Sequence, residues 1–387
     1  MLWAGLAIML GACVPVHPPA LDAVPVASVS ECRTAAARIA FDFDGASASA
    51  CAIDGERAFT VLVTPEHAPP INPSPWYAFR YDSQGDAPVT VTLRYLGAKH
   101  RYNPKWNGGG DWRELPTQVA NDGLSATVRV PGGVGVVAAQ EVIAPAEHAA
   151  DLRRWGAAVG GHPVTLGHSH DGRPIEALRL GRADAPRLVI LLGRQHPPEV
   201  TGALALRAFV DALTAQFARD PALGANTQFL IIPLLNPDGT ARGQWRANRG
   251  GVDLNRDWGD FAQPETRSVK AWLDALPAGV RPVAMIDFHS TSRNLFYVQG
   301  DEATNAQQRF RAEWLEGKQN ALPGYAFTIE PRNANPGSGT AKNWFFGTYG
   351  IPAYTYEVAD TADRAATRQA AAQLAAGLFP ALQRLDE

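Results

Sequence analysis

The 387-residue sequence lacks an excess of basic residues, a long apolar run and an internal repeat, and each absence excludes a class of protein. Its 35 Lys and Arg residues are balanced by 38 Asp and Glu residues, which gives a formal net charge of -3. Because there is no basic excess, nucleic-acid binding has no electrostatic support. No apolar run approaches the roughly 20 residues of a transmembrane helix, and no internal repeat is present. With 46% hydrophobic and 19% charged residues, the chain is typical of a folded protein of two domains.

Cysteine is also scarce, with three residues at positions 13, 32 and 51. Residues 2–14 are apolar and run into prolines, as in the hydrophobic part of a signal peptide. Because Leu10-Gly-Ala-Cys13 resembles a bacterial lipobox, we expect export to the periplasm and lipid attachment to a membrane through Cys13. The alternative is a plain cleaved signal peptide with an incidental cysteine. Export would leave Cys32 and Cys51, nineteen residues apart in the first domain, to form a disulfide, whereas a cytosolic chain would hold them as two small buried residues.

The whole chain divides into four segments: a signal or lipoprotein segment at 1–14, a Pro-rich tether at 15–30, and domains at 31–145 and 146–387. Short β segments separated by turns predict an antiparallel β-sandwich for the first domain, at 58–63, 76–81, 89–95, 126–130 and 134–139. Apolar strands then alternate with Ala- and Leu-rich helices, which predicts an α/β domain. We expect its strands at 188–192, 228–235, 283–288, 295–298 and 353–358, and its helices at 199–217, 264–276, 303–318 and 361–378.

His196 and Glu199 stand together where the predicted strand 188–192 ends and a helix begins. Imidazole nitrogen and carboxylate oxygen both bind zinc, and a catalytic zinc site has three protein ligands and one position for water. His-x-x-Glu also arises by chance, as a surface histidine beside a glutamate at a helix N-terminus. The preceding strand and the two prolines between the residues favour a metal-binding loop.

His289 ends the apolar segment 283–288, at the edge of the sheet where α/β proteins build their sites. We interpret it as the third ligand of one zinc ion, Zn2+, rather than as a core histidine.

The densest polar stretch of the chain covers residues 236–239 and 244–257. Three arginines, Arg246, Arg249 and Arg256, lie there with Asp253 and Asn255. Arginine binds carboxylates in a bidentate fashion, so the stretch suits an anionic substrate group or an oxyanion beside a metal. The alternative is a solvated loop whose arginines pair with its own aspartates.

Glu357 lies within the apolar segment 353–358. Metal hydrolases need a base that takes a proton from the metal-bound water and returns it to the leaving amine, and a partly desolvated glutamate has a suitable pKa. The alternative is a glutamate on an exposed strand face.

Taken in order, these segments resemble the M14 zinc metallocarboxypeptidases over residues 148–387. The likeness lies in the His-x-x-Glu, in "WRANRGGVDLNRDW", in "DFHS" and in "TYE". Through "PWYAFRYDS" and "RYNPKWNGGGDW", the first domain is similar to the β-sandwich of the cytosolic carboxypeptidase subfamily. The resemblance implies an α/β catalytic domain with a mixed sheet flanked by helices, preceded by an antiparallel β-sandwich.

The same resemblance implies roles for individual residues. His196, Glu199 and His289 would bind the zinc, Asp253 would orient His196, and Glu357 would be the general base and acid.

The resemblance also implies how substrate is bound. Arg246 would stabilise the tetrahedral oxyanion, while Asn255 and Arg256 would bind the free α-carboxylate, which makes an enzyme an exopeptidase.

Two positions depart from the family. Residues 331–339 contain no tyrosine where the family has a substrate-capping one, so Tyr349 is a candidate replacement. Pro198 stands in place of an arginine that makes an outer substrate contact.

Lys342 lies close to where the family sets its side-chain preference. It favours an acidic C-terminal residue, Glu or diaminopimelate, although an exposed lysine without a role is the alternative.

The leading hypothesis is an exported zinc metallopeptidase that cleaves the C-terminal bond of a peptide or muropeptide with a zinc-bound water activated by Glu357. A murein-peptide amidase or an N-acyl amino acid deacylase with the same zinc site is the first alternative. A catalytically vestigial binding protein is the second, and the joint presence of the three ligands and Glu357 disfavours it.

Overall fold

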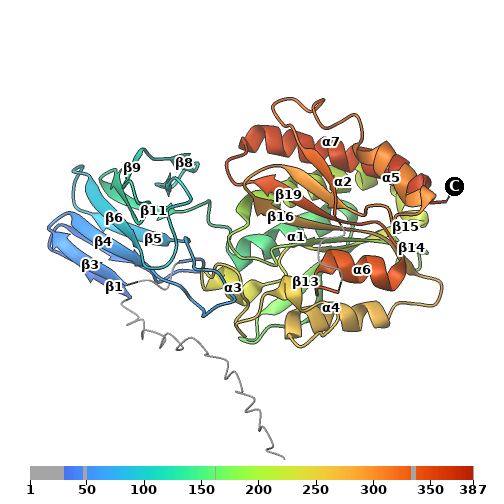
Figure 1. Cartoon of the computed structure of the whole chain (residues 1–387), viewed down its shortest axis with the longest axis horizontal. Coiled ribbons are helices and arrows are strands. Elements are labelled where there is room, and N and C mark those ends of the chain that lie inside the picture. Colours follow the sequence, from blue (N-terminus) through green and yellow to red (C-terminus); the bar gives the residue numbers. More distant parts are fainter. Residues whose placement is uncertain (1–29, 47–49, 162, 333–336, 387) are drawn as a thin grey trace, which may run out of the picture.

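The computed structural model describes residues 30–46, 50–161, 163–332 and 337–386 (Figure 1). The predicted signal segment with Cys13, and the predicted tether up to residue 29, lie outside these ranges. A β-sandwich forms one end of the described molecule and a mixed sheet covered by helices forms the other (Figure 1). The predicted domain division falls at the start of helix α1 (Pro145–Val159) and stays a prediction.

The sandwich consists of two sheets with the strand orders β1-β2-β5-β11-β7-β8 and β3-β4-β6-β10-β9. Their bounds are β1 Glu31–Arg33, β2 Ala37–Ala40, β3 Cys51–Gly55, β4 Ala58–Val63, β5 Ala78–Ser83, β6 Val89–Tyr95, β7 Lys105–Asn107, β8 Arg113–Glu114, β9 Thr117–Val119, β10 Ser125–Val130 and β11 Gly133–Ala138. The described pairs are antiparallel except that β4 and β6 run parallel. The predicted antiparallel sandwich is therefore confirmed, with one parallel pair added.

Alternating side chains build the core of the sandwich. In β4 the buried residues are Phe59, Val61 and Val63, and in β6 every second residue from Val89 is buried. This period of two puts one face of each strand inside and the other in solvent. A disulfide joins Cys32 in β1 to Cys51 in β3, as predicted, and so ties the two sheets together.

The third sheet is mixed, with the order β12-β13-β15-β14-β16-β19-β17-β18. Its bounds are β12 Pro163–His168, β13 Pro174–Leu180, β14 Arg187–Gly193, β15 Thr227–Ile232, β16 Arg281–Thr291, β17 Leu295–Val298, β18 Thr328–Pro331 and β19 Ala353–Ala359. The central strands β15, β14, β16 and β19 are parallel neighbours. Their carboxyl ends therefore lie along one edge of the sheet, where α/β folds place their sites.

Helices cover both faces of this sheet (Figure 1). Their bounds are α1 Pro145–Val159, α2 Val200–Arg219, α3 Pro237–Ala241, α4 Pro264–Asp274, α5 Asn305–Leu315, α6 Ala341–Tyr349 and α7 Arg364–Gln383, with 3-10 turns η1 Pro221–Ala225 and η2 Leu254–Arg256. Buried residues of α1, α2, α5 and α7 share one core, and those of α4 and α6 share the core on the opposite face. None of the helices in the described ranges has the length and apolar content needed to span a bilayer.

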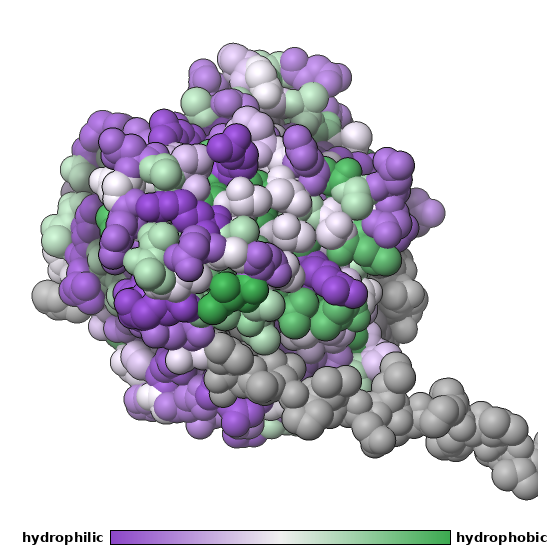
Figure 2. Space-filling model, turned by 90° about the vertical axis from the view of Figure 1, so that its left-hand side faces the viewer, coloured by the Kyte–Doolittle hydropathy of each residue, from purple (hydrophilic) through white to green (hydrophobic). Residues whose placement is uncertain are grey.

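The sandwich is packed directly against the start of α2. Its hydrophobic core includes Val200 and Ala203 of that helix, together with Trp245. Figure 2 shows the sandwich end of the molecule, where hydrophilic residues are interspersed with smaller apolar areas. In the described ranges, the exposed large apolar side chains all belong to the sandwich: Ile53, Leu96, Val119, Leu124 and Val134.

Candidate metal centre and substrate cavity

The loop between β14 and α2 presents His196 and Glu199. Pro197 and Pro198 have no backbone N–H to donate, and α2 begins at Val200 with Glu199 as its N-cap. Helix α2 therefore starts one residue later than predicted, and the carboxylate of Glu199 lies at its positive end.

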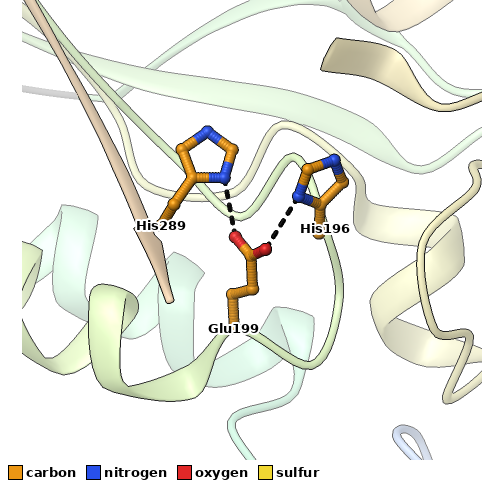
Figure 3. A group of neighbouring side chains, drawn as sticks. All are labelled: His196, Glu199 and His289. Carbon is orange, nitrogen blue, oxygen red and sulfur yellow. Dashed lines mark hydrogen bonds and ion pairs between the residues drawn. The ribbon is translucent and has the colours of Figure 1, made fainter. Parts of the chain in front are cut away.

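Three side chains converge on one point (Figure 3). The Nδ1 atom of His196 lies 2.8 Å from Oε1 of Glu199, and Nδ1 of His289 lies 2.7 Å from Oε2 of the same carboxylate. One ligand atom from each residue lies within 4.8 Å of the others. All three side chains are at least largely buried, and their donor set is the one that zinc takes in catalytic sites.

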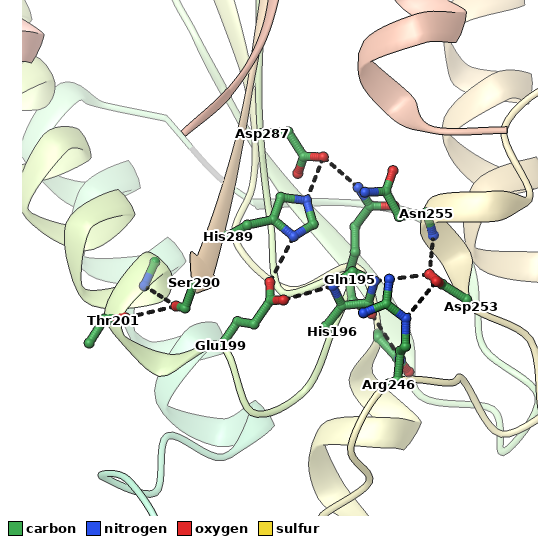
Figure 4. A network of polar contacts seen from close by, with 12 residues as sticks. Gln195, His196, Glu199, Thr201, Arg246, Asp253, Asn255, Asp287, His289 and Ser290 are labelled. Atoms are coloured by element: carbon green, nitrogen blue, oxygen red, sulfur yellow. Dashed lines mark hydrogen bonds and ion pairs between the residues drawn. The ribbon is translucent and has the colours of Figure 1, made fainter. Parts of the chain in front are cut away.

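Two further carboxylates hold the histidine rings from behind (Figure 4). Oδ1 of Asp253 lies 2.9 Å from Nε2 of His196, and Oδ2 of Asp287 lies 2.7 Å from Nε2 of His289. Such contacts fix which ring nitrogen faces the metal and raise its basicity. Asp253 thus lies where the family resemblance placed it.

Sequence reasoning missed Asp287. It stands two residues before His289 in β16, so the period of two along a strand puts both side chains on the same face of the sheet. That spacing was the signal that could have identified it. The side-chain amide of Gln195 also donates to Asp287, with a distance of 2.6 Å.

Glu357 lies beside His289 on the neighbouring strand, because the two residues are register partners in the parallel pair β16 and β19. Among the described residues, its buried Oε2 atom has no hydrogen-bond partner. Burial raises the pKa of Glu357 to about 7, although the nearby His289 acts in the opposite direction. A carboxyl group with such a pKa can accept and release a proton near neutrality.

A cavity of about 290 Å³ opens beside these groups. It gathers the predicted site residues from segments far apart in the chain: His196, Glu199, Arg246, Asn255, Arg256, His289, Lys342 and Glu357. Asp253 lies behind His196 instead. Tyr349 is not among the lining residues and packs against Trp344 and Phe345, whereas Tyr297 does line the cavity.

The candidate anion-binding groups are held in place by contacts of their own. Arg246 donates from Nε to Oδ2 of Asp253 at 2.7 Å, and Arg256 donates to the carbonyl oxygen of Asn255 at 2.6 Å. Oδ1 of Asn255 accepts from the backbone N–H of Ala341, with a distance of 2.9 Å, which leaves the amide nitrogen as the donor for a ligand. Each of these candidate groups thus has a partner within the protein itself, although Arg256 is exposed.

Lys342, in the first turn of α6, points its Nζ at the carbonyl oxygen of Arg332, 2.7 Å away. Burial lowers the pKa of this lysine to about 8, although Glu302 raises it. Arg332 itself lines the cavity and lies over the ring of Tyr297, 4.9 Å from its centre. Sequence reasoning did not find Arg332 or Tyr297, since neither stands in a pattern that marks a site.

The sandwich also contributes to the wall of the cavity, through Asn72, Arg101 and Tyr102. The guanidinium of Arg101 forms an ion pair with Asp360, 2.6 Å away, three residues beyond Glu357. Arg101 and Tyr102 begin the segment "RYNPKWNGGGDW", but the sequence did not assign them to the site, because their place in it depends on how the sandwich packs against the α/β part.

Two histidines and a glutamate that converge on one point, faced by a buried carboxylate, define a metal-dependent hydrolase site. A family model described as zinc carboxypeptidase matches residues 161–379, more than half of the chain. The chain therefore belongs to the zinc carboxypeptidase family, a family of metallopeptidases.

Individual relatives agree with this assignment. Cytosolic carboxypeptidase 2 from Danio rerio is 28% identical over 43% of this chain and 25% of its own length. Cytosolic carboxypeptidase 6 from Mus musculus is 28% identical over 49% of this chain and 38% of its own length. The chain thus spans less than half of the length of either relative.

Solved structures share the fold over nearly the whole chain. A metallo-carboxypeptidase from Burkholderia cenocepacia aligns with a TM-score of 0.75 at 20% identity, over 90% of this chain and 99% of its own. A metallo-carboxypeptidase from Pseudomonas aeruginosa aligns with a TM-score of 0.69 at 22% identity, over 90% and 99%. The likeness therefore includes the sandwich as well as the α/β part.

Gly202 is the point of closest approach between α2 and β16, and we predict that Gly202→Ala weakens the metal site. A Cβ atom there would lie 2.4 Å from the carbonyl oxygen of His289, so the start of α2 must move away from β16 and carry Glu199 with it. We expect a loss of about 1–3 kcal/mol in the free energy of unfolding, measured by urea denaturation, and weaker zinc binding in a chelator competition titration.

Gly347→Ala is the matched control, because Gly347 lies in α6 and no atom would lie within 4 Å of the added Cβ. That variant should bind zinc normally and gain roughly 0.5–1 kcal/mol from helix propensity. Unchanged zinc affinity in Gly202→Ala would contradict the prediction.

Proposed function

We propose that this protein is a zinc-dependent metallocarboxypeptidase that removes the C-terminal residue of a peptide. The observation that carries the proposal is the position of Glu357, a buried carboxyl group with an unpartnered oxygen, beside His289 and in one cavity with Asn255 and Arg256. A base, a metal-ligand set and groups for a free carboxylate therefore lie around one space. Peptide hydrolysis at a C-terminus needs these three elements together.

The donor set of His196, Glu199 and His289 fits a zinc ion, because Asp253 and Asp287 turn both Nδ1 atoms towards the carboxylate of Glu199. Bound zinc supplies Lewis-acid chemistry, which makes water acidic enough to act as a nucleophile and polarises a carbonyl group.

The chain's own side chains supply the remaining steps. Glu357 takes a proton from the attacking water and returns it to the leaving amine, which suits a carboxyl pKa near neutrality. Arg246 donates to the carbonyl oxygen as it becomes an oxyanion, and its contact with Asp253 holds it ready for this. Asn255 and Arg256 hold the terminal carboxylate and so place the last peptide bond at the metal.

We predict that Glu357→Gln lowers kcat for a peptide with a free C-terminus by about 10²–10⁴-fold, because the amide cannot accept the proton. Zinc content, measured by mass spectrometry, should stay near one ion per chain. Glu330→Gln, which changes a glutamate of β18 that pairs with Arg293, should keep full activity.

The same assay distinguishes a carboxypeptidase from an amidase and from a deacylase. Peptides with a free or an amidated C-terminus, N-acetyl amino acids and muropeptides are compared, so that an amidase or a deacylase would be recognised by its substrate. Full activity in Glu357→Gln, or a purified protein without zinc that is still active, would contradict the proposed mechanism.

We also propose a preference for acidic C-terminal residues, glutamate or a second carboxylate such as that of diaminopimelate. Lys342 and Arg332 line the cavity together with Arg256, and Lys342 is almost fully buried. A buried cation favours an anionic partner strongly because little water screens it. These charges support the preference that Lys342 suggested in the sequence.

Lys342→Met is predicted to lower kcat/KM for a C-terminal Glu by about 10–100-fold relative to a C-terminal Gln, the value of one charge-assisted hydrogen bond. The ammonium group is present below its pKa of about 8 and is lost as the pH rises through that value. The preference of the wild type for Glu over Gln should therefore decline above pH 8, whereas that of Lys342→Met should not change there.

Lys318→Met is the control, since Lys318 also bonds backbone carbonyls, those of Glu313 and Trp314, but does not line the cavity. An unchanged Glu-to-Gln ratio in Lys342→Met would rule out this role.

We propose, finally, that the chain is exported and attached to a membrane through a lipid on Cys13. The apolar segment before Cys13 supports export. The disulfide between Cys32 and Cys51 supports an oxidising compartment.

Cys13→Ser is predicted to move the protein from the membrane fraction to the soluble periplasmic fraction of a bacterial host, followed by immunoblotting. Cys32→Ser removes the disulfide but should leave the protein in the membrane fraction. Identical fractionation of Cys13→Ser and wild type would contradict lipid attachment.

A further inference from the structure

One loop of the sandwich reaches the backbone of the residue assigned to the oxyanion. Glu66, between β4 and β5, is partly buried, and its Oε1 atom accepts from the backbone N–H groups of both Trp245 and Arg246, the latter at 3.2 Å. A hydrogen bond from Ser74 adds to these contacts. Burial raises the pKa of Glu66 to about 7, so the site holds a carboxyl group at an energetic cost that simple packing would avoid.

The two residues that precede Arg246, Gln244 and Trp245, also contact side chains of the sandwich. Arg101 and Tyr102 contact the ring of Trp245, with distances of 5.0 Å and 6.2 Å to its centre. Nε2 of His67 lies 3.2 Å from Nε2 of Gln244. The segment 244–246 is therefore held by contacts from residues of the sandwich that lie about 140 to 180 positions earlier in the chain.

From Arg246 the contacts continue to the metal centre. Its Nε atom donates to Oδ2 of Asp253, and Oδ1 of Asp253 lies 2.9 Å from Nε2 of the ligand His196. Figure 4 shows these last two contacts. Glu66 thus contacts the backbone of Arg246, and the side chain of Arg246 contacts Asp253, which in turn contacts His196, so a path of contacts leads from the sandwich to the metal site.

We propose that Glu66 is a positioning residue for the reaction: by fixing the backbone at Arg246, it holds the guanidinium where the oxyanion develops. This proposal rests on the proposed peptidase function. Preorganised donors contribute most to catalysis when they need not reorient during the reaction, and a backbone anchored at one residue leaves only side-chain torsions free. The sandwich thus contributes to catalysis by positioning Arg246.

The test is a double-mutant cycle between Glu66 and Arg246 on the full-length, zinc-loaded enzyme. Glu66→Ala should lower kcat about tenfold with KM within about twofold, because an oxyanion donor acts mainly in the transition state. Glu66→Gln keeps an acceptor oxygen for both N–H groups and should restore most of kcat. In an Arg246→Ala background, Glu66→Ala should cause no further loss, since the group that it positions is gone.

Two controls separate positioning from a merely structural role. Asp54→Ala removes a carboxylate of the sandwich that accepts from the hydroxyl of Thr60 and not from segment 244–246, so its kcat should equal that of the wild type. Hydrogen exchange of the amides of Trp245 and Arg246 should accelerate in Glu66→Ala and stay slow in Glu66→Gln, while zinc content stays unchanged.

A normal kcat in Glu66→Ala, an equal loss in Glu66→Gln, or additive losses in the double variant would each overturn the proposal and leave the proposed function standing. Loss of zinc from Glu66→Ala would also overturn it, because the variant would then act through the metal site as a whole. A wild type without peptidase activity would overturn the proposed function itself, and the positioning role with it.

Discussion

Four carboxylates are gathered around two histidines in the interior of this protein, and the need to keep them there shapes the rest of the site. Glu199 faces both rings, Asp253 and Asp287 hold the rings from behind, and Glu357 lies beside His289. Like charges at such distances repel strongly in a poorly solvated region unless cations balance them. A divalent ion at the convergence point would provide that balance, as would the surrounding arginines.

The fold meets this constraint by using the carboxyl edge of a parallel sheet. Neighbouring strands β16 and β19 place His289 and Glu357 at the same level, and the N-terminus of α2 brings Glu199 towards them. Gly202 lets that helix approach β16 closely, and the hydroxyl of Ser290 accepts from the Gly202 N–H at 2.8 Å. Backbone packing thus places ligands whose mutual repulsion would otherwise drive them apart.

The sandwich completes the arrangement from the other side. Its core continues into the first turns of α2 and around Trp245, and its loops reach the segments that carry Arg246 and Asp360. The bacterial metallo-carboxypeptidase structures that resemble this chain do so over 90% of its length, sandwich included. Because residues of both parts form the walls of the cavity, the cavity keeps its shape only while the sandwich is packed against the α/β part.

Much of the site was predictable from sequence, because local rules govern it. A strand followed by His-x-x-Glu, a histidine at the end of an apolar strand and a glutamate inside another each mark a sheet edge where ligands gather. Even so, α1 and α6 were not predicted. Helix α6 contains Gly347 and a run of aromatic residues with modest helix propensity, and it is stabilised by packing of Phe345 in the core.

The sequence by itself determined the candidate metal ligands, the candidate base and the sheet that carries them, since each depends on residue types at short spacing. Only the tertiary structure decided which residues enclose the substrate. Asp287 lies behind His289, Tyr349 packs away from the cavity, and Arg101 and Glu66 reach the site from the sandwich. The contacts of Glu66 with Arg246 and of Arg101 with Asp360 join residues 180 and 259 positions apart. They depend on how two surfaces fit together, and no spacing along a single chain encodes that fit.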